Sequence, residues 1–489
     1  MSPETALGLA LLGPWVTAVG VALTGRWPNL REAVTLVTSS ALFVVVAGTV
    51  LPAVAAGERP RLELVEILPG LRLAFEVEPL GIVFALVASG LWIVTSLYAV
   101  GYLRGHGEGN QTRFFACFAL AIAGALGVAF AANLFTLFVF YEAITLSTYP
   151  LVTHHGTPKA MAAGRRYLGI LMGTSVGLLL MALVWTHALV GHNDFRPGGI
   201  LEGKVDGPLV GVLLALFAFG TAKAALMPFH RWLPAAMVAP TPVSALLHAV
   251  AVVKAGVFTV TKVVVYIFGI DFLWESGWGT WLAWAAAFTL VSASVVAMGK
   301  DNLKARLAYS TIGQLAYIVL GAALLTPVSV VGAGLHIVMH AVGKITLFFC
   351  AGAIYVGAHK SEISDMHGLG RRMPVTFGAF LVGSLAIIGI PPFALWSKVG
   401  LGWGALPHQP LMLAVYMGAS VLAVGYLMPV VGKAFFLPPR GEDQGAEGIR
   451  EAPLLCVLPP VLTALGCVAL NVYILLDDSL VALLAEIVR

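Results

Sequence analysis

Residues 219–234 read FGTAKAALMPFHRWLP, an apolar stretch interrupted by Lys223 and by prolines at 228 and 234. Each proline removes a backbone hydrogen bond from a helix, and Gly220 loosens the turn before Lys223. A broken helix at membrane depth is tolerated only where protein or a water-filled cavity satisfies the freed backbone groups. The stretch therefore predicts a discontinuous membrane helix with an internal cavity beside Lys223.

A second stretch repeats this grouping. Residues 384–400 read SLAIIGIPPFALWSKVG, in which Gly389, Pro391 and Pro392 precede Lys398. Two interrupted apolar segments in corresponding halves of a chain indicate an internal repeat with a site in each half. We therefore expect two repeats, one containing Lys223 and the other Lys398.

The composition around these stretches is that of an integral membrane protein. The chain has 489 residues, of which 59% are hydrophobic and 11% charged, and its mean hydropathy is +0.93. Soluble domains carry about 25% charged residues. Since a membrane helix needs about 20 apolar residues, the pattern predicts an all-α polytopic membrane protein. Its expected spans, about 14 in all, begin near residues 5, 32, 77, 113, 133, 160, 208, 243, 278, 305, 328, 373, 409 and 453.

No polar stretch is long enough to separate soluble domains. The longest, such as residues 57–78, have the length of interhelical loops. Residues 5–25 lack a basic n-region and a cleavage site, so they are expected to remain as a span. We expect one membrane domain over 1–489, made of N-terminal helices (1–112), a first half-channel repeat (113–270), a second half-channel repeat (278–437) and a C-terminal helix (453–489).

The basic residues of the loops are distributed unevenly. Loops after odd-numbered spans hold sixteen Lys and Arg, whereas the opposite face, with both termini, holds six. Because cytoplasmic loops carry the excess of positive charge, we expect both termini outside, in the plasma membrane of a prokaryote. Orientation explains the basic loops, and no nucleic acid is expected as a partner.

Seven ionisable side chains lie inside the expected spans. They are Glu142, Lys223, Lys254, Lys262, Lys344, Lys398 and Lys433. Each costs at least ~2.5 kcal/mol at mid-bilayer on insertion scales, so together they indicate a polar pathway. The bases are all lysines, which lose a proton readily when desolvated, whereas a guanidinium stays protonated.

Glu142 lies in residues 133–152, NLFTLFVFYEAITLSTYPLV, and is the one acid that we place inside a span. One interpretation makes it a buried partner of a base that fixes helix packing. The sharper hypothesis pairs Glu142 with Lys223, so that the protonation of one group changes the proton affinity of the other.

The segment after the first interruption carries further bases. Residues 239–262 read APTPVSALLHAVAVVKAGVFTVTK and contain His248, Lys254 and Lys262. His248 and Lys254 are six positions apart, so only a distorted helix presents both to one channel. Lys262 lies toward the outer end of its span and is read as either a channel exit or an anchor.

Residues 334–349, GLHIVMHAVGKITLFF, place His336, His340 and Lys344 four positions apart, on one helical face. Three interpretations stay open: a metal site, core histidines with satisfied hydrogen bonds, and a water-supported proton relay. The relay is favoured because Lys344 extends the line and the segment offers no third metal ligand. Lys433 lies near the end of its span, from which its ammonium can reach the interface.

At these residues the chain strongly resembles the proton-translocating antiporter-like family. That family comprises the three large membrane subunits of respiratory complex I, the A and D subunits of Mrp-type multisubunit Na+/H+ antiporters, and membrane-bound hydrogenase subunits. The resemblance implies about fourteen spans with two inverted five-helix repeats, helices broken at the seventh and twelfth spans, and a hydrated axis of charged residues. The stretches that carry it are residues 133–151, 220–256, 301–321, 336–355 and 368–398.

The resemblance also implies roles for single residues. These are an inner modulating pair of Glu142 and Lys223, a link of His248 and Lys254, a second half-channel of His336, His340 and Lys344, and a terminal proton donor, Lys398. The run 344–374 is most similar to the Mrp D-type subunits and their hydrogenase relatives. A lysine at 398 differs from the complex I subunit that typically has Glu there.

The function expected from this resemblance is that of a proton-translocating subunit of a multisubunit cation/proton antiporter. The alternatives are a proton-pumping subunit of a complex I-type oxidoreductase or membrane-bound hydrogenase, a non-transporting scaffold, and a free-standing transporter of an organic substrate. Expected partners are other membrane subunits, the lipid bilayer, H+ and, as an open question, Na+. The sequence has no Walker loop, Rossmann fingerprint, or iron–sulfur or haem spacing. No cofactor, metal or catalytic site of its own is therefore expected, and any redox energy would come from partner subunits.

Overall fold

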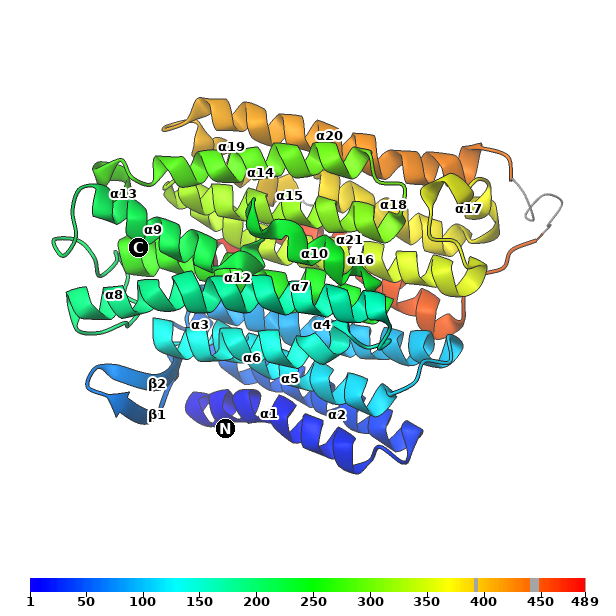
Figure 1. Ribbon diagram of the computed structural model, residues 1–489, viewed down its shortest axis with the longest axis horizontal. Helices are drawn as coiled ribbons and strands as arrows, with labels where there is room; N and C mark the ends of the chain where they lie inside the picture. The colour runs from blue at the N-terminus through cyan, green and yellow to red at the C-terminus, as the bar shows by residue number, and fades with distance from the viewer. Residues whose placement is uncertain (391–394, 440–447, 489) are drawn as a thin grey trace.

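The computed structural model describes residues 1–390, 395–439 and 448–488. Figure 1 shows long helices that lie roughly side by side. In the described part, 11 helices are long and apolar enough to cross a membrane, so the chain is a multi-pass membrane protein. They are α1 (Pro3–Leu23), α2 with α3 (Pro28–Ala55), α4 (Pro79–Gly105), α5 (Gln111–Ala129), α6 (Leu134–Val152), α7 with α8 (Pro158–Val190), α11 with α12 (Thr241–Phe268), α14 (Thr280–Met298), α16 (Pro327–Ala358), α20 (Pro410–Phe436) and α21 (Leu454–Leu476).

Three further expected spans correspond to helices outside that set. α15 (Leu303–Ala323) is long but more polar, while α9 (Pro208–Gly220) and α18 (Pro374–Ile388) are apolar but short. Each expected span therefore begins within four residues of the first residue of an observed helix. The prediction of an all-α polytopic membrane protein is confirmed. The remaining short helices are α10 (Trp232–Ala235), α13 (Ile270–Ser276), α17 (Leu369–Arg372), α19 (Leu395–Ala405) and α22 (Ser479–Ala485).

Local sequence explains where many of these helices begin. Pro79, Pro158 and Pro327 each stand at the first position of a helix, where the missing N–H would be unpaired anyway and the fixed φ suits the helix. Before α16, the Thr326 side chain accepts a hydrogen bond from the backbone of Ser329, whose hydroxyl in turn receives one from the backbone of Thr326. This capping box satisfies two helix-terminal donors.

Two helices form the centre of the bundle. In the most apolar window of Thr241–Phe268, 100% of the residues are buried, and in that of Pro327–Ala358, 94% are. Peripheral helices expose far more, since only 28% of the corresponding window of Pro28–Ala55 is buried. The three histidines and three of the six lysines that the sequence singles out (Lys254, Lys262 and Lys344) therefore stand on the two helices with the least access to lipid.

The two interrupted helices are broken at glycines. α9 ends at Gly220 and leads into a 3-10 turn, Ala222–Ala224, that contains Lys223. α18 ends at Ile388 and is capped by Gly389, which has φ 86° and where an added Cβ would lie 2.6 Å from Cδ of Lys398. Pro391 and Pro392, which the sequence predicts to break this second helix, lie outside the described residues.

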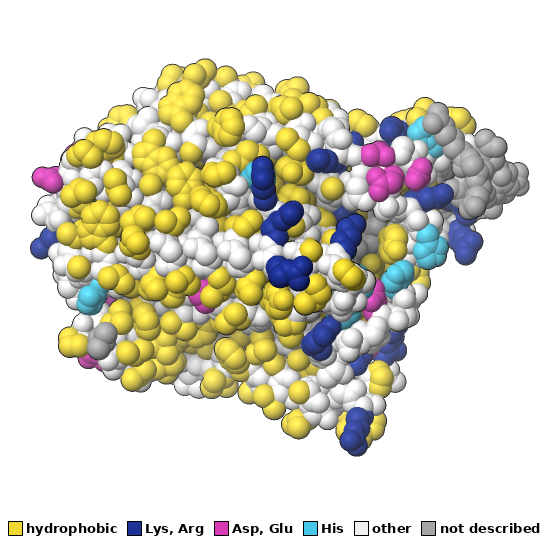
Figure 2. Space-filling model, in the orientation of Figure 1, with side chains coloured by type: hydrophobic (Ala, Val, Ile, Leu, Met, Phe, Trp, Pro, Cys, Tyr) yellow, Lys and Arg dark blue, Asp and Glu magenta, His cyan; other side chains and the backbone are white. Residues whose placement is uncertain are grey.

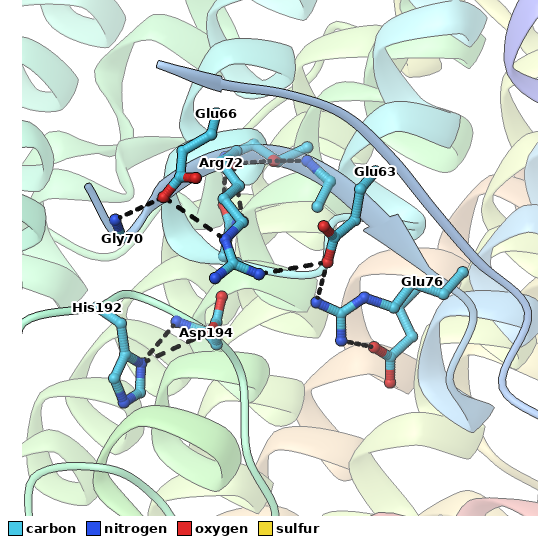
Figure 3. A network of polar contacts seen from close by, with 11 residues as sticks. Glu63, Glu66, Gly70, Arg72, Glu76, His192 and Asp194 are labelled. Carbon is cyan, nitrogen blue, oxygen red and sulfur yellow. Dashed lines mark hydrogen bonds and ion pairs between the residues drawn. The ribbon is translucent and has the colours of Figure 1, made fainter. Parts of the chain in front are cut away.

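A β-hairpin occupies the loop over residues 57–78, where the sequence analysis predicts no strand. β1 (Arg61–Leu68) pairs antiparallel with β2 (Leu71–Glu76). Figure 3 shows its charged side chains meeting one another: Arg72 and Glu63 form an ion pair of 3.4 Å, and Glu66 accepts a hydrogen bond from Gly70 N at 3.0 Å. Cross-strand pairs of opposite charge stabilise such a ribbon.

Basic side chains gather toward one end of the bundle. Figure 2 shows Lys and Arg mainly over the half of the molecule that holds α17 and the start of α7, whereas the face elsewhere is largely apolar. This distribution follows the uneven loop charges of the sequence. That this end faces the cytoplasm stays a prediction.

Candidate functional site

Lys223 is held on α6 by neutral groups. Its Nζ donates to the Tyr141 carbonyl oxygen at 2.7 Å and to the Thr145 hydroxyl at 2.6 Å. The ammonium also lies 3.2 Å from the centroid of the Tyr141 ring, where the negative face of the ring attracts a cation. Lys223 is fully buried. The charge is thus desolvated and is satisfied by a carbonyl, a hydroxyl and an aromatic face.

Glu142 does not form the direct ion pair with Lys223 that the sharper hypothesis expects. Across the described residues, neither carboxylate oxygen of Glu142 has a hydrogen-bonding partner. Its neighbours along α6, Val139 and Leu146, are 39% and 57% exposed, but Glu142 itself is half-buried and both its carboxylate oxygens are buried. Glu142 is adjacent to Tyr141, whose carbonyl accepts from Lys223, and charges interact through a low-dielectric interior without touching. Coupling between the two residues therefore stays a prediction, without the contact.

Lys254 and His340 join the two central helices. Lys254 Nζ lies 2.6 Å from His340 Nδ1, and both residues are buried. His248, the other expected member of the link, stands in a π-helical turn, Leu246–Val250, and its ring packs 4.6 Å from that of Phe348. Neither ring nitrogen of His248 has a partner in the described part. The structure thus brings Lys254 to the second half of the chain rather than to His248.

His336 connects α16 to two other helices. Its Nδ1 lies 3.1 Å from the Ser397 hydroxyl in α19, and its Nε2 lies 2.9 Å from Gln314 Oε1 in α15. The rings of His336 and His340 are stacked with centroids 6.3 Å apart. Ser397 immediately precedes Lys398. A line of buried polar groups therefore runs from Lys254 through both histidines to the residue beside Lys398.

Lys344 and Lys398 also have neutral partners. Lys344 Nζ donates to the Ser310 hydroxyl at 2.7 Å. Lys398 Nζ donates to the Ile388 carbonyl at 2.9 Å and to the Ser420 hydroxyl at 3.0 Å. Lys398 lines a cavity of about 560 Å³. Lys344 lies on the same helix face as His336 and His340 but bonds a different residue, Ser310. It is therefore not part of the line that connects the histidines to Ser397.

Sequence reasoning missed the neutral residues that hold these groups. Ser310, Gln314 and Tyr317 lie four and three positions apart in α15. Ser310 accepts from Lys344, Gln314 bonds His336, and the ring of Tyr317 faces the ammonium of Lys398. Polar side chains at helical spacing inside an apolar segment were the available signal. Their chemistry is that of proton-carrying hydroxyl and amide groups, which both donate and accept.

A polar cavity of about 210 Å³ opens where the α4–α5 and α6–α7 loops meet the start of α11. His155 Nε2 lies 3.1 Å from Glu108 Oε1, and its Nδ1 lies 3.2 Å from the Val238 carbonyl. The hydrogen bond to Glu108 raises the pKa of His155, and the same bond lowers the pKa of Glu108. Three loop segments are thus tied together at the rim of this cavity.

Two polar residues that are unpartnered in the described part of the chain lie further along the segment that borders this cavity. Thr241 lines the cavity; Ser244 follows in α11, and His248 follows in the π-helical turn that continues it. The Ser244 hydroxyl and the His248 ring nitrogens are buried without partners among the described residues. Such groups need water or a passing ligand to satisfy them.

Lys262 and Lys433, the two lysines inside the spans that have no role in the expected axis, differ in their surroundings. Lys262 is buried and forms an ion pair of 2.7 Å with Glu78, whereas Lys433 is partly buried in the last turn of α20. In the part of the chain that the structure describes, no group of three or more His, Cys, Asp or Glu could hold a metal ion.

Comparison with known proteins gives a family. The family model described as NADH:quinone oxidoreductase/Mrp antiporter, TM, matches residues 131–423. The N subunit of NADH-quinone oxidoreductase from Desulforudis audaxviator is 31% identical over 417 residues, which are 81% of this chain and 81% of that protein. NAD(P)H-quinone oxidoreductase chain 5 of a Synechocystis species is 29% identical over 464 residues, which are 90% of this chain but only 66% of the relative's length.

Solved structures have the same fold. A chain of the Mrp complex from Dietzia sp. DQ12-45-1b superposes with a TM-score of 0.87 at 23% identity, covering 99% of this chain and 97% of that one. A chain of the membrane-bound sulfane sulfur reductase, an archaeal respiratory membrane complex, gives 0.87 at 24% identity, with 99% and 98% covered. Together with the family match over more than half of its length, these findings show that the chain belongs to the transmembrane family of NADH:quinone oxidoreductase and Mrp antiporter subunits.

Proposed function

We propose that this chain is a proton-translocating antiporter-like subunit of a multisubunit membrane complex. Protons move along a mid-membrane axis whose members are Glu142, Lys223, His248, Lys254, His336, His340, Lys344 and Lys398. Within the family, an Mrp-type cation/proton antiporter with this chain in the place of its D-type subunit is the parent complex that we favour. The lysine at 398 and the likeness of residues 344–374 to the Mrp D-type subunits support that choice.

One observation carries the proposal: the polar line between the two halves of the chain. Lys254 lies 2.6 Å from His340, and His336 lies 3.1 Å from Ser397, the neighbour of Lys398. The gap between the histidines, 6.3 Å from ring to ring, is one that a water molecule can bridge. Buried ionisable residues that face the interior of a membrane protein mark ion and proton pathways.

The cavity beside His155 supplies an intake for this axis. It lies at the end of the bundle where basic side chains gather, which we expect to be cytoplasmic. From Thr241 the route passes the unpartnered groups of Ser244 and His248 and reaches the central lysines. Lys398, at the other end of the polar line, is then the residue from which the proton leaves the axis.

Glu142 modulates the first lysine through its charge. A carboxylate near Lys223 raises the affinity of that amine for a proton, and a change in the surroundings of Glu142 lets the proton move on. Val139 and Leu146 are exposed on the same helix, so a neighbouring subunit that packs against α6 would change the surroundings of the buried Glu142 carboxylate. The state of a partner is thereby transmitted to the axis electrostatically.

The test uses the assembled complex in vesicles. Lys223→Ala and Glu142→Ala are expected to abolish transport driven by a pH gradient, with the complex still assembled. Lys159→Gln, an exposed position at the start of α7, is the control and is expected to transport normally. Retained transport in both axis variants would refute the proposal.

Identification of the co-purifying subunits separates the parent complexes. A set of small Mrp-type membrane proteins supports the antiporter, whereas iron–sulfur subunits indicate a complex I-type or hydrogenase-type assembly. Migration of the chain as a lone monomer on a native gel would favour a free-standing transporter. Normal transport in all axis variants would leave a scaffold as the remaining alternative.

A further inference from the structure

Lys262 differs from the lysines of the axis in having a carboxylate partner. Its Nζ lies 2.7 Å from Glu78 Oε1 and donates to the Ala131 carbonyl at 2.9 Å. The centroid of the Phe195 ring lies 4.0 Å away. Three segments thus surround the ammonium: the residue before α4, the α5–α6 connection and the loop after α8.

The ammonium borders a small polar cavity. The cavity has a volume of about 100 Å³ and is also lined by Arg59, Glu76, Tyr266 and Glu486. It lies beside the hairpin, whose ion pairs Figure 3 shows around Glu76 and Glu63. A simple anchor between two helices needs no cavity, whereas this volume accommodates an ion with a few waters.

The other carboxylates of the cavity already have basic partners. Glu486 pairs with Arg59 at 2.6 Å, and Glu76 pairs with Arg61 at 3.3 Å. For Glu78, the ion pair with Lys262 is the one that the described residues form. If that ammonium leaves or loses its charge, a largely buried carboxylate remains uncompensated, which is strongly unfavourable.

The groups around the Lys262 ammonium are those that coordinate a hard metal cation. A carboxylate and a backbone carbonyl supply oxygen ligands, and the ring of Phe195 faces a cation. We propose that the Glu78 carboxylate and the Ala131 carbonyl form a binding site for a monovalent metal cation, for which the Lys262 ammonium is a tethered competitor.

The exchange conserves charge. The Lys262 ammonium releases one proton to water in the cavity, and the neutral amine moves aside. One metal cation then enters from the cavity and binds between Glu78 and the Ala131 carbonyl. In the reverse direction, protonation of Lys262 restores the ion pair and expels the metal. The site does not include Lys223 or Lys398. Its test is therefore independent of the test of the proposed function.

Thermal unfolding of the purified full-length chain in lipid nanodiscs tests this site. The salt is NaCl, KCl or choline chloride at equal ionic strength, and choline is too bulky to be coordinated by Glu78. We expect Lys262→Met to be stabilised by Na+ or K+, with the half-maximal concentration about tenfold lower than for the wild type. Lys204→Met, an exposed position at the same end of the bundle, is the matched control and is expected to respond like the wild type.

Glu78→Gln in the Lys262→Met background is expected to abolish the cation-specific shift. A Lys262→Met chain that responds to NaCl, KCl and choline chloride alike would overturn the proposal. If Lys262→Met unfolds during purification, Na+ or K+ is expected to restore its fold, and failure of both cations to do so would equally count against the site. The choice between Na+ and K+ follows from which salt acts at the lower concentration.

Discussion

The contact between Lys254 and His340 makes the sharpest prediction about the axis. Their nitrogens lie 2.6 Å apart inside a bundle where both side chains are buried. A hydrogen bond to a charged group contributes roughly 1.5–3 kcal/mol of net stabilisation. Substitution of either residue removes an interaction energy of that size from the contact. If the proton crosses between the halves at this contact, Lys254→Met or His340→Phe slows transport by about 10- to 150-fold.

The assay is proton uptake by vesicles that contain the complex, under an imposed pH gradient and with a pH-sensitive dye inside. A double-mutant cycle gives the decisive result, because residues that act through one contact have non-additive effects. The double variant is therefore expected to be no slower than the slower single variant. Multiplicative effects of the two substitutions, or wild-type transport in His340→Phe, would refute a route through this contact.

Three further predictions concern positions around the axis. Ser397→Ala is expected to slow proton uptake in the same vesicles, whereas Ser397→Thr retains the hydroxyl and most of the rate; equal rates in both would remove Ser397 from the route. His155→Gln is expected to lower the melting temperature most near pH 5 to 6. The raised pKa of His155 gives stability that is complete below its usual value of about 6.5 and is lost as the pH rises through the raised value. The lowered pKa of Glu108 gives stability that is present above its usual value of about 4.3 and is lost as the pH falls through the lowered value. Melting curves of both chains from pH 4 to 9 check this window, and a difference that grows toward pH 9 would contradict it. Gly256→Ala would drive its Cβ against the backbone of the broken segment at Lys223, an overpacking that costs about 1–3 kcal/mol; an unchanged melting temperature would show that the two segments do not pack so closely.

The starts of the spans and the breaks near Lys223 and Lys398 were predictable because they depend on local sequence. Long apolar runs and the glycines before each lysine are visible within about 20 residues. The shared face of His336, His340 and Lys344 follows from helical spacing in the same way. The hairpin was missed although Pro69 and Gly70, between two runs rich in Leu, Val and Ile, are a turn signal.

The partners of the buried groups were not predictable, because they depend on how distant helices pack. His340 is 86 positions from Lys254, and Ser310 is 34 from Lys344. Charge pairing suggested a carboxylate for Lys223, yet the structure supplies a carbonyl and a hydroxyl. Electrostatic reasoning from sequence favours opposite charges, whereas in a packed membrane interior a neutral oxygen at the right place is sufficient.

This difference in partners has a consequence for what each lysine can do. A neutral amine still donates a hydrogen bond to a carbonyl or hydroxyl, so Lys223, Lys344 and Lys398 can lose a proton without leaving their acceptors unpaired. Lys262 cannot lose its proton in this way, because its positive charge compensates the charge of Glu78. Without that charge the carboxylate would remain buried and uncompensated. A chain of neutral-partner lysines therefore suits the movement of protons alone, and a lysine bound to a carboxylate suits the exchange of a proton for another cation. If both proposals hold, proton movement and cation binding would depend on chemically distinct lysines of one fold.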